Sequence, residues 1–270
     1  MRSFKYPIYF LIVTLLPCLV YGGDILLQST TSTNNSGFYD HILPKFKNAT
    51  GISVKVVAVG TGQAITNAEN CDADILIVHA KEAEEDFVAG GGGIKRHDLM
   101  YNDFVIVGPS KDPANIRKAK NILEALASIF KIQPPFISRG DNSGTHKKEL
   151  DLWRRISAPI KNHSGKWYKE TGSGMGTTLN IAAELDAYTL SDRATWLTFK
   201  NKRALKILFE GDLLLFNQYG AILINPEKCP KTNIKEARAL LDWVLSDVGQ
   251  TEIGNYKING KQLFYPNAQK

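Results

Sequence analysis

The chain has 270 residues, 43% of them hydrophobic, and a formal net charge of +6. This length accommodates one large domain or two modest ones with a sizeable buried core. The positive charge is small and spread out, and no basic run alternates with aromatic residues as a strand-binding groove requires. The sequence therefore predicts no nucleic-acid partner, while the mildly basic balance favours an anionic ligand.

The first twenty-two residues have the composition of an export signal. Arg2 and Lys5 precede an apolar run over residues 8–20, and Gly22 and Gly23 follow it. This run is short for a membrane-spanning helix, so we expect a signal peptide over residues 1–22 and cleavage near Gly22. An uncleaved membrane anchor is the alternative interpretation.

Three cysteines bear on processing and on disulfides. Cys18 would permit a lipid anchor, but a proline precedes it where a lipidation motif needs a small residue, so we expect no lipid there. Cys71 and Cys229 remain after cleavage. They could pair in an oxidising compartment, and the sequence does not decide between a disulfide and two buried thiols. The five histidines show no pair at metal-ligand spacing, so no metal-cation site is predicted.

Short apolar runs alternate with helical patterns along the first half of the chain. Each run is apolar on both faces, as in buried strands, and residues 38, 42 and 46 form an apolar helix stripe with Pro44 inside it. A glycine run over 90–93 ends a further helix. The elements predicted here are strands at 25–27, 54–59, 75–78 and 104–108, and helices over 38–46 and 82–89.

The same alternation continues in the second half. The elements predicted here are strands at 136–138, 187–190, 205–209 and 221–224, and helices over 121–130, 147–153, 177–185, 193–200 and 235–246. Strand–helix alternation indicates an α/β protein with mostly parallel sheets. No linker rich in proline or serine is present, so two lobes would be joined by extended strands. The apolar segments 104–108 and 219–224 are the predicted crossings.

The segment Ser138-Arg139-Gly140-Asp141-Asn142-Ser143-Gly144-Thr145-His146 is the richest in chemistry. It combines a guanidinium, hydroxyls and glycines, and it opens the predicted helix over 147–153. A helix N-terminus presents unpaired N–H groups and the positive end of a dipole, which together with an arginine suit a small oxyanion. The alternative is that Ser143 or Thr145 only caps the helix.

Three further segments have related chemistry. A hydroxyl run over 28–37 follows the first strand, and Val59-Gly60-Thr61-Gly62 ends the second. Ligands bind open α/β sheets at such strand ends, although the hydroxyl run could also be a solvated loop. The glycine-rich segment 172–178 opens a helix but lacks the flanking features of a dinucleotide site, so we interpret it as a tight turn.

Catalysis is the weaker prediction. Asp141, Ser143 and His146 are the residue types of a catalytic triad, but close neighbours in one turn rarely reach the required geometry. No G-x-S-x-G nucleophile elbow is present. We predict a binding protein that is not an enzyme, with a secreted hydrolase using Ser143 as the alternative.

Together these segments resemble those of tungstate-binding proteins from bacterial ABC importers. The resemblance runs from Asp24 to Asn267, with one departure at Ser29, where the family favours threonine, and another at the glycine run 90–93. The segments that carry it are 29–37, 59–62, 138–149, Met100-Tyr101-Asn102-Asp103-Phe104-Val105-Ile106-Val107-Gly108-Pro109, Tyr188-Thr189-Leu190-Ser191-Asp192-Arg193-Ala194 and Phe216-Asn217-Gln218-Tyr219-Gly220.

The resemblance implies a type II periplasmic binding protein-like fold, with lobe 1 over 24–107 and 214–270 and lobe 2 over 108–213. It implies a monomeric periplasmic protein that captures tungstate, or molybdate, and delivers it to an ABC permease in the inner membrane, without a cofactor. The residues it implies around the oxyanion are Thr30, Thr31 and Thr61 from lobe 1, and Arg139, Ser143, Thr145 and the nearby Arg193 from lobe 2.

The physical chemistry of the anion agrees with this interpretation. A deprotonated dianion has only acceptors, so it needs hydroxyls, N–H groups and a fixed positive charge. Phosphate keeps a proton near neutral pH and needs an acceptor, which Asp141 could supply. We favour the interpretation that Asp141 orients Arg139 or binds the loop backbone. Phosphate or sulfate binding, and an anion sensor that signals to a receptor, remain alternatives.

Overall fold

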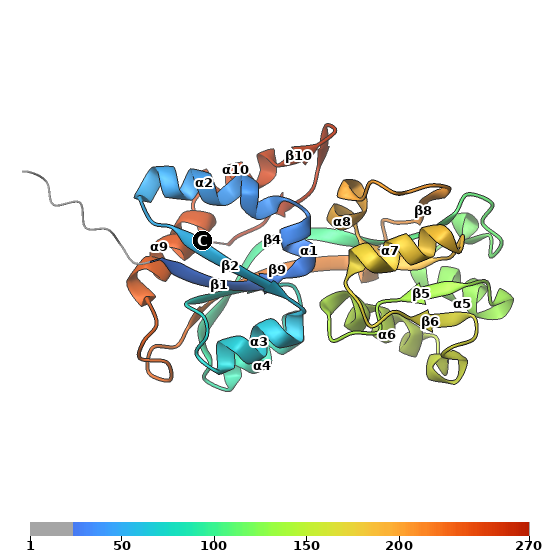
Figure 1. The fold of residues 1–270 in the computed structure, drawn as a ribbon, viewed down its shortest axis with the longest axis horizontal. Coiled ribbons are helices and arrows are strands. Elements are labelled where there is room, and N and C mark those ends of the chain that lie inside the picture. Colours follow the sequence, from blue (N-terminus) through green and yellow to red (C-terminus); the bar gives the residue numbers. More distant parts are fainter. Residues whose placement is uncertain (1–23, 270) are drawn as a thin grey trace, which may run out of the picture.

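The fold consists of two α/β lobes that lie side by side (Figure 1). It is seen in a computed structural model that describes residues 24–269, so the predicted signal peptide over 1–22 lies outside the described residues. Within the described range, no helix combines the length and the apolar character needed to cross a membrane. Two long strands, β4 and β9, run through both lobes.

Lobe 1 is built from both ends of the described chain. Its elements are β1 (Ile25–Thr30), α1 (Thr31–Asn35), α2 (Phe38–Thr50), β2 (Val54–Val59), α3 (Thr61–Glu69), β3 (Ile75–Val78), α4 (Lys81–Ala89), the first part of β4 (Gly93–Pro109), most of β9 (Phe216–Ile224), α9 (Ile234–Leu245), α10 (Asp247–Asn255), and the short strands β10 (Lys257–Ile258), β11 (Lys261–Gln262) and β12 (Tyr265–Pro266).

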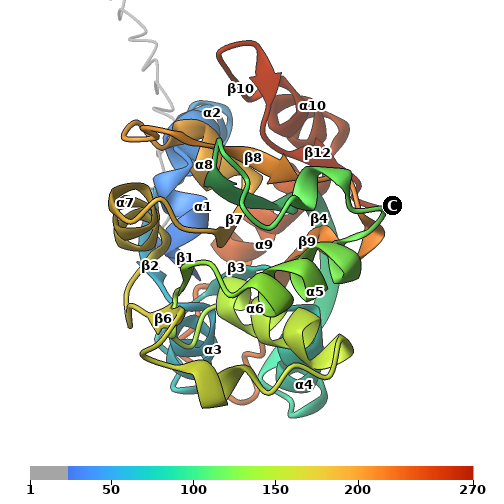
Figure 2. The ribbon, with the colours of Figure 1, turned by 90° about the vertical axis from the view of Figure 1, so that its right-hand side faces the viewer.

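Lobe 2 is formed by the middle of the chain, seen end-on in Figure 2. Besides the second part of β4, its elements are α5 (Ile122–Ile132), β5 (Phe136–Ser138), α6 (Gly144–Arg155), β6 (Tyr168–Glu170), α7 (Met175–Glu184), β7 (Thr189–Asp192), α8 (Arg193–Thr198) and β8 (Leu205–Phe209), with 3-10 turns at Ile116–Lys118, Ile160–His163 and Leu213–Leu215.

The main sheet is mixed, which corrects the expectation of mostly parallel sheets. Its strands follow the order β12-β4-β9-β3-β1-β2, and β7 and β8 pair with β4. Only β1–β2 and β1–β3 are parallel in this sheet, with the separate pair β5–β6, whereas β9 runs antiparallel to both β3 and β4. The reason is topological, because β4 leaves lobe 1 and β9 returns to it, so the two strands must run in opposite directions.

The crossings between lobes lie at other residues than predicted. Segment 104–108 pairs with β7 and β8 inside lobe 2, and segment 220–223 pairs with β3 inside lobe 1. Met100 and Tyr219 belong to the apolar core of lobe 1, whereas Phe104 and Leu215 belong to that of lobe 2. The cores therefore divide near residues 101–103 and 216–218, a few residues from the limits 107/108 and 213/214 expected from the sequence.

Successive side chains of one strand enter apolar clusters on opposite sides of the sheet in each lobe. In β3, Ile75 and Ile77 enter the cluster under α2 and α9, while Leu76 and Val78 enter the cluster with α3 and Phe87 of α4. In β4, Phe104 and Ile106 pack on one side of lobe 2, and Val105 and Val107 on the other. This period of two explains why these runs are apolar at every position.

A disulfide joins Cys71 to Cys229, which decides between the two states left open by the sequence. Cys71 follows the carboxyl end of α3, and Cys229 lies in the turn after β9. The bond spans a sequence separation of 158 residues, so it ties the N-terminal part of lobe 1 to the segment that returns from lobe 2. Constraining so long a loop lowers the entropy of the unfolded chain.

Glu149 is a buried acid on helix α6 in lobe 2. Its Oε1 accepts hydrogen bonds from the Tyr168 hydroxyl at 2.7 Å and from the Trp153 indole N–H at 3.2 Å. The side chain is 2% exposed, and burial raises its pKa to about 7. Because the ordinary pKa of the unfolded chain is lower, the unfolded state ionises first as the pH rises.

We therefore predict that Glu149 destabilises the fold increasingly from about pH 4.5 to about pH 7, with no further change above that. Glu149→Gln keeps an acceptor for Tyr168 and Trp153 but does not titrate. It should be more stable than the parent protein at pH 8, by up to about 3 kcal/mol, and should lose this advantage near pH 4.5.

Urea unfolding of both proteins across this pH range measures the difference directly. Glu69→Gln, a change of the same kind at an exposed position, serves as the control and should leave the pH profile unchanged. A constant difference between Glu149→Gln and the parent at every pH would contradict the prediction.

Candidate oxyanion site

A pocket lies where the ends of three lobe 1 strands face lobe 2. Strands β1, β2 and β3 are parallel, so Thr30, Val59 and the residue after Val78 lie at the same edge of the sheet. Lobe 2 contributes the loop between β5 and α6. The pocket is lined by Thr30, Thr31, Ser32, Val59, Gly60, Thr61, His79, Arg139, Ser143, Gly144 and Thr145.

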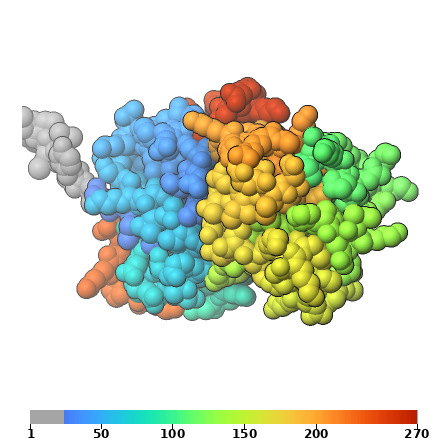
Figure 3. All heavy atoms as spheres, turned by 45° about the vertical axis from the view of Figure 1, so that its right-hand side comes forward, coloured from blue at the N-terminus to red at the C-terminus, as the bar shows by residue number. Residues whose placement is uncertain are grey.

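The pocket is small and lies between lobes that are closed on each other. Its empty volume is about 160 Å³, so the walls of the two lobes lie close together. Two hydrogen bonds join the lobes beside it, from Gly62 N to Asn142 O and from Gly144 N to Thr61 Oγ1, both 3.2 Å. Figure 3 shows the blue half and the yellow half in direct contact along this seam.

Glycine at position 62 makes this approach possible. A Cβ atom added there would lie 2.0 Å from Asn142 Nδ2 of the opposite lobe, so any side chain would displace Asn142 or hold the lobes apart. This accounts for one of the two glycines that the sequence places after the second strand.

The lining of the pocket carries one fixed positive charge and no carboxylate. The cation is Arg139, whose side chain is only 3% exposed. The helices α3 and α6 begin at the pocket, with Thr61 and Gly144 as their first residues. The first N–H groups of a helix lack acceptors inside it. Those of Gly62 and Gly144 donate across the seam, so the two N-termini contribute their remaining N–H groups and a positive field to the pocket. Such a lining favours a small anion.

Asp141 holds Arg139 in place from outside the pocket. Its Oδ2 accepts from Arg139 Nη2 at 2.6 Å and from Nε at 3.2 Å, and its Oδ1 accepts from the Ser143 hydroxyl at 2.5 Å. Both oxygens are therefore occupied, and Asp141 does not line the pocket. This is the orienting role favoured in the sequence analysis, as opposed to that of an acceptor for a protonated ligand.

The hydroxyls of the pocket differ in how far they are already paired. The Thr145 hydroxyl is buried without a partner among the described residues, and a buried polar atom of this kind calls for one. The Thr61 hydroxyl accepts from Gly144 N and keeps its own proton available. The Ser143 hydroxyl donates to Asp141, and Thr30 caps α1 by accepting from Thr33 N.

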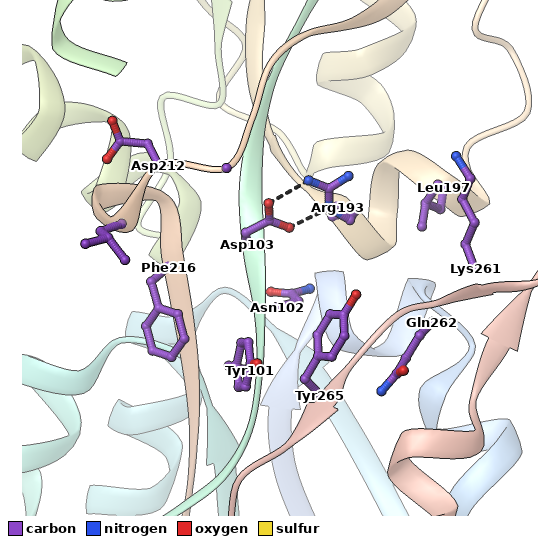
Figure 4. Close-up of a pocket in the computed structure, with 12 residues that line it drawn as sticks. Tyr101, Asn102, Asp103, Arg193, Leu197, Asp212, Phe216, Lys261, Gln262 and Tyr265 are labelled. Carbon is purple, nitrogen blue, oxygen red and sulfur yellow. Dashed lines mark hydrogen bonds and ion pairs between the residues drawn. The ribbon is translucent and has the colours of Figure 1, made fainter. Parts of the chain in front are cut away.

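Six of the seven residues expected around the oxyanion line this pocket, and Arg193 does not. Arg193 lines a separate cavity beside the crossing strands (Figure 4). Its guanidinium pairs with both oxygens of Asp103, at 2.5 and 2.6 Å, and with Glu210 Oε2 at 2.6 Å. These carboxylates raise its pKa and take up its charge. Through this ion pair Arg193, the first residue of α8, holds the start of that helix against β4.

Sequence reasoning missed His79 and Ser32 as pocket residues. His79 is 6% exposed and immediately follows β3, and Ser32 lies within the hydroxyl run. The signal for His79 was its place after a buried parallel strand, the same signal that pointed to Thr30 and Thr61. Searching for paired histidines at metal-ligand spacing left this single one unnoticed.

The site lacks the geometry of a serine hydrolase. The Ser143 hydroxyl faces Asp141, while the His146 ring contacts Ser138 Oγ at 3.1 Å through Nδ1. No histidine is placed to take the Ser143 proton, as the serine mechanism requires. Within residues 24–269, no group of three histidine, cysteine or acidic residues could hold a metal ion.

Known proteins share both the sequence and this architecture. The model of the PBP superfamily domain matches residues 22–248. A tungstate-binding protein TupA of Peptoclostridium acidaminophilum is 48% identical over 92% of this chain and 87% of its own length. The tungstate-binding protein TupA of Campylobacter jejuni is 39% identical over 88% and 89%.

A solved structure extends the similarity to three dimensions. That of the tungstate-binding protein TupA from Desulfovibrio alaskensis matches with a TM-score of 0.80 and 47% identity, over 91% of this chain and 99% of that one. The chain therefore belongs to the PBP superfamily and, within it, to the family of the TupA tungstate-binding proteins.

Proposed function

We propose that this protein is a solute-binding protein that captures tungstate between its lobes and delivers it to an ABC permease. The observation that carries the proposal is the closed pocket with one buried arginine, two helix N-termini, several hydroxyls and no carboxylate. A tetrahedral dianion has acceptors on every side and needs such a complement of donors. The relatives named above are tungstate-binding proteins.

In this proposal five of the expected residues contact the oxyanion, and a sixth, Ser143, supports the site. Thr30, Thr31 and Thr61 contact it from lobe 1, and Arg139 and Thr145 from lobe 2. The Ser143 hydroxyl donates its proton to Asp141, and its oxygen caps the N-terminus of α6 by accepting from His146 N. Because both lobes contribute donors, the anion favours the closed state, and closure is the signal that the permease reads.

The set of hydrogen-bond donors in the pocket also bears on which anions are bound preferentially. Monohydrogen phosphate carries a proton that must be accepted, and the nearest carboxylate, Asp141, already accepts on both oxygens. We therefore propose that fully deprotonated anions are preferred over phosphate. Molybdate presents the same set of acceptor oxygens to these donors, and it remains the second candidate ligand.

The remaining parts of the proposal concern location and partners. Export by the N-terminal segment would place the protein in the periplasm, free of a lipid at Cys18 and working as a monomer beside an inner-membrane permease. The protein itself would perform no chemistry on its ligand, and it would need no cofactor.

Calorimetric titration of the mature protein with four anions tests the proposed ligand. We expect tight binding of tungstate, comparable or weaker binding of molybdate, weaker binding of sulfate, whose shorter bonds bring its oxygens near fewer of the donors, and much weaker binding of phosphate, whose proton finds no acceptor. Thermal unfolding should agree, since a ligand at about a thousand times its Kd adds about 4 kcal/mol and raises Tm. Phosphate binding as tight as that of tungstate would refute the assignment.

Thr145→Val tests whether the unpaired hydroxyl serves the anion. Valine keeps the shape but cannot donate, and a hydrogen bond to a charged group contributes about 1.5–3 kcal/mol, so the tungstate Kd should rise roughly 10- to 100-fold. The anion-free protein should be as stable as the parent, because no existing hydrogen bond is lost.

Thr189→Val is the matched control, since Thr189 is also a buried threonine but does not line the pocket. It should leave the tungstate Kd unchanged. An unaltered Kd in Thr145→Val would show that this hydroxyl does not contact the anion.

A further inference from the structure

His79 lies in the wall of the pocket and is held on three sides. Its ring stacks on Tyr219 with centroids 4.8 Å apart, and Nδ1 lies 3.0 Å from Asn217 Oδ1. Its other nitrogen, Nε2, lies 3.1 Å from the hydroxyl of Ser32, which also lines the pocket. The ring thus joins β9, one of the two strands that run through both lobes, to the binding site.

The neighbouring amides determine which nitrogen carries the proton. Asn217 Nδ2 donates to Asn102 Oδ1 at 2.6 Å, so Asn217 turns its carbonyl oxygen toward His79. That oxygen can only accept, and Nδ1 must therefore be the protonated nitrogen. In the neutral ring, Nε2 has a lone pair and accepts the only proton of the Ser32 hydroxyl.

This arrangement leaves the Ser32 hydroxyl without a proton for the anion. The direction of the bond reverses if the ring gains a proton, because Nε2–H then donates to Ser32 Oγ. The Ser32 hydroxyl proton is released and can point into the pocket. The same step places a positive charge beside the anion.

The charges around the ring act on this protonation in opposite directions. Burial lowers the pKa of His79, Arg139 opposes its protonation from lobe 2, and Asp192 at the end of β7 favours it. The other groups against the ring, Tyr219, Phe104 and Asn217, carry no charge. A bound dianion offsets the repulsion from Arg139 and adds an attraction of its own.

We propose that oxyanion binding is coupled to the uptake of one proton from solvent by His79 Nε2, which keeps this proton and thereby frees the Ser32 hydroxyl proton to point toward the ligand. The inference rests on the proposed function, because it takes the dianion as the ligand of this pocket. It assigns His79 the role of a positioning residue that sets the pH dependence of binding. As the pH rises, the neutral ring prevails and affinity falls.

Calorimetry of tungstate binding tests the coupling. Titrations at one pH near 7 in PIPES, HEPES and Tris, which differ in ionisation enthalpy, give the number of protons taken up. We expect an uptake approaching one proton per tungstate, and a Kd that rises up to tenfold per pH unit between pH 6.5 and 8. His79→Gln should still bind tungstate, more weakly, with an uptake near zero.

His97→Gln is the control, since His97 lies on β4 outside the pocket and should leave the uptake unchanged. Nitrogen-15 NMR of the parent protein measures the protonation of the ring directly and does not depend on the folding of a variant. We expect a neutral ring with its proton on Nδ1 without tungstate, and a ring with both nitrogens protonated when tungstate is bound. Tungstate binding without proton uptake, or equal uptake in His79→Gln, would overturn the inference alone. Absence of tungstate binding in the parent protein would overturn the proposed function.

Discussion

The ion pair between the buried Arg139 and the partly exposed Asp141 is the interaction on which the site depends. Arg139 is only 3% exposed, and burying an unpaired guanidinium would be costly. The Asp141 carboxylate, with Oδ2 2.6 Å from Arg139 Nη2, offsets this cost, and its other oxygen accepts from the Ser143 hydroxyl at the start of α6. The carboxylate stays outside the pocket lining, so the arginine is neutralised on one side and open to a ligand on the other. The helix N-termini of α3 and α6 extend this positive environment across the seam between the lobes.

Closure follows from the same chemistry. Each lobe alone presents only part of the donors, and the lobe-to-lobe bonds of Gly62 and Gly144 bring them together around a space of about 160 Å³. Removing water from this space strengthens every donor–anion interaction, because the local dielectric falls. The chain passes between the lobes near Asp103 and Phe216 as extended backbone of β4 and β9, so the lobes are joined without a flexible linker.

Much of the fold followed from the sequence, and the failures have physical causes. Strands at 54–59, 75–78, 136–138 and 205–209 coincide with β2, β3, β5 and β8, because buried strands leave uninterrupted apolar runs. The first part of β4 and the helix α3 were missed, since the former is polar along much of its length and the latter begins in a glycine-rich turn. Six of the seven site residues implied by the family resemblance line one pocket, and the segments that hold them could be located from strand ends and helix starts. Arg193 lines a different cavity, where it pairs with Asp103 and Glu210. Because these partners are distant from it in sequence, no local pattern could predict the pairs.

Crystallography with tungstate bound tests the central claim most directly, because tungsten scatters anomalously at its L edge. The account predicts one strong anomalous peak in the pocket between Thr61 and Arg139, with the lobes closed as they are here and the Thr145 hydroxyl within hydrogen-bond distance of an anion oxygen. A peak in the cavity beside Arg193, or at the surface only, would contradict it.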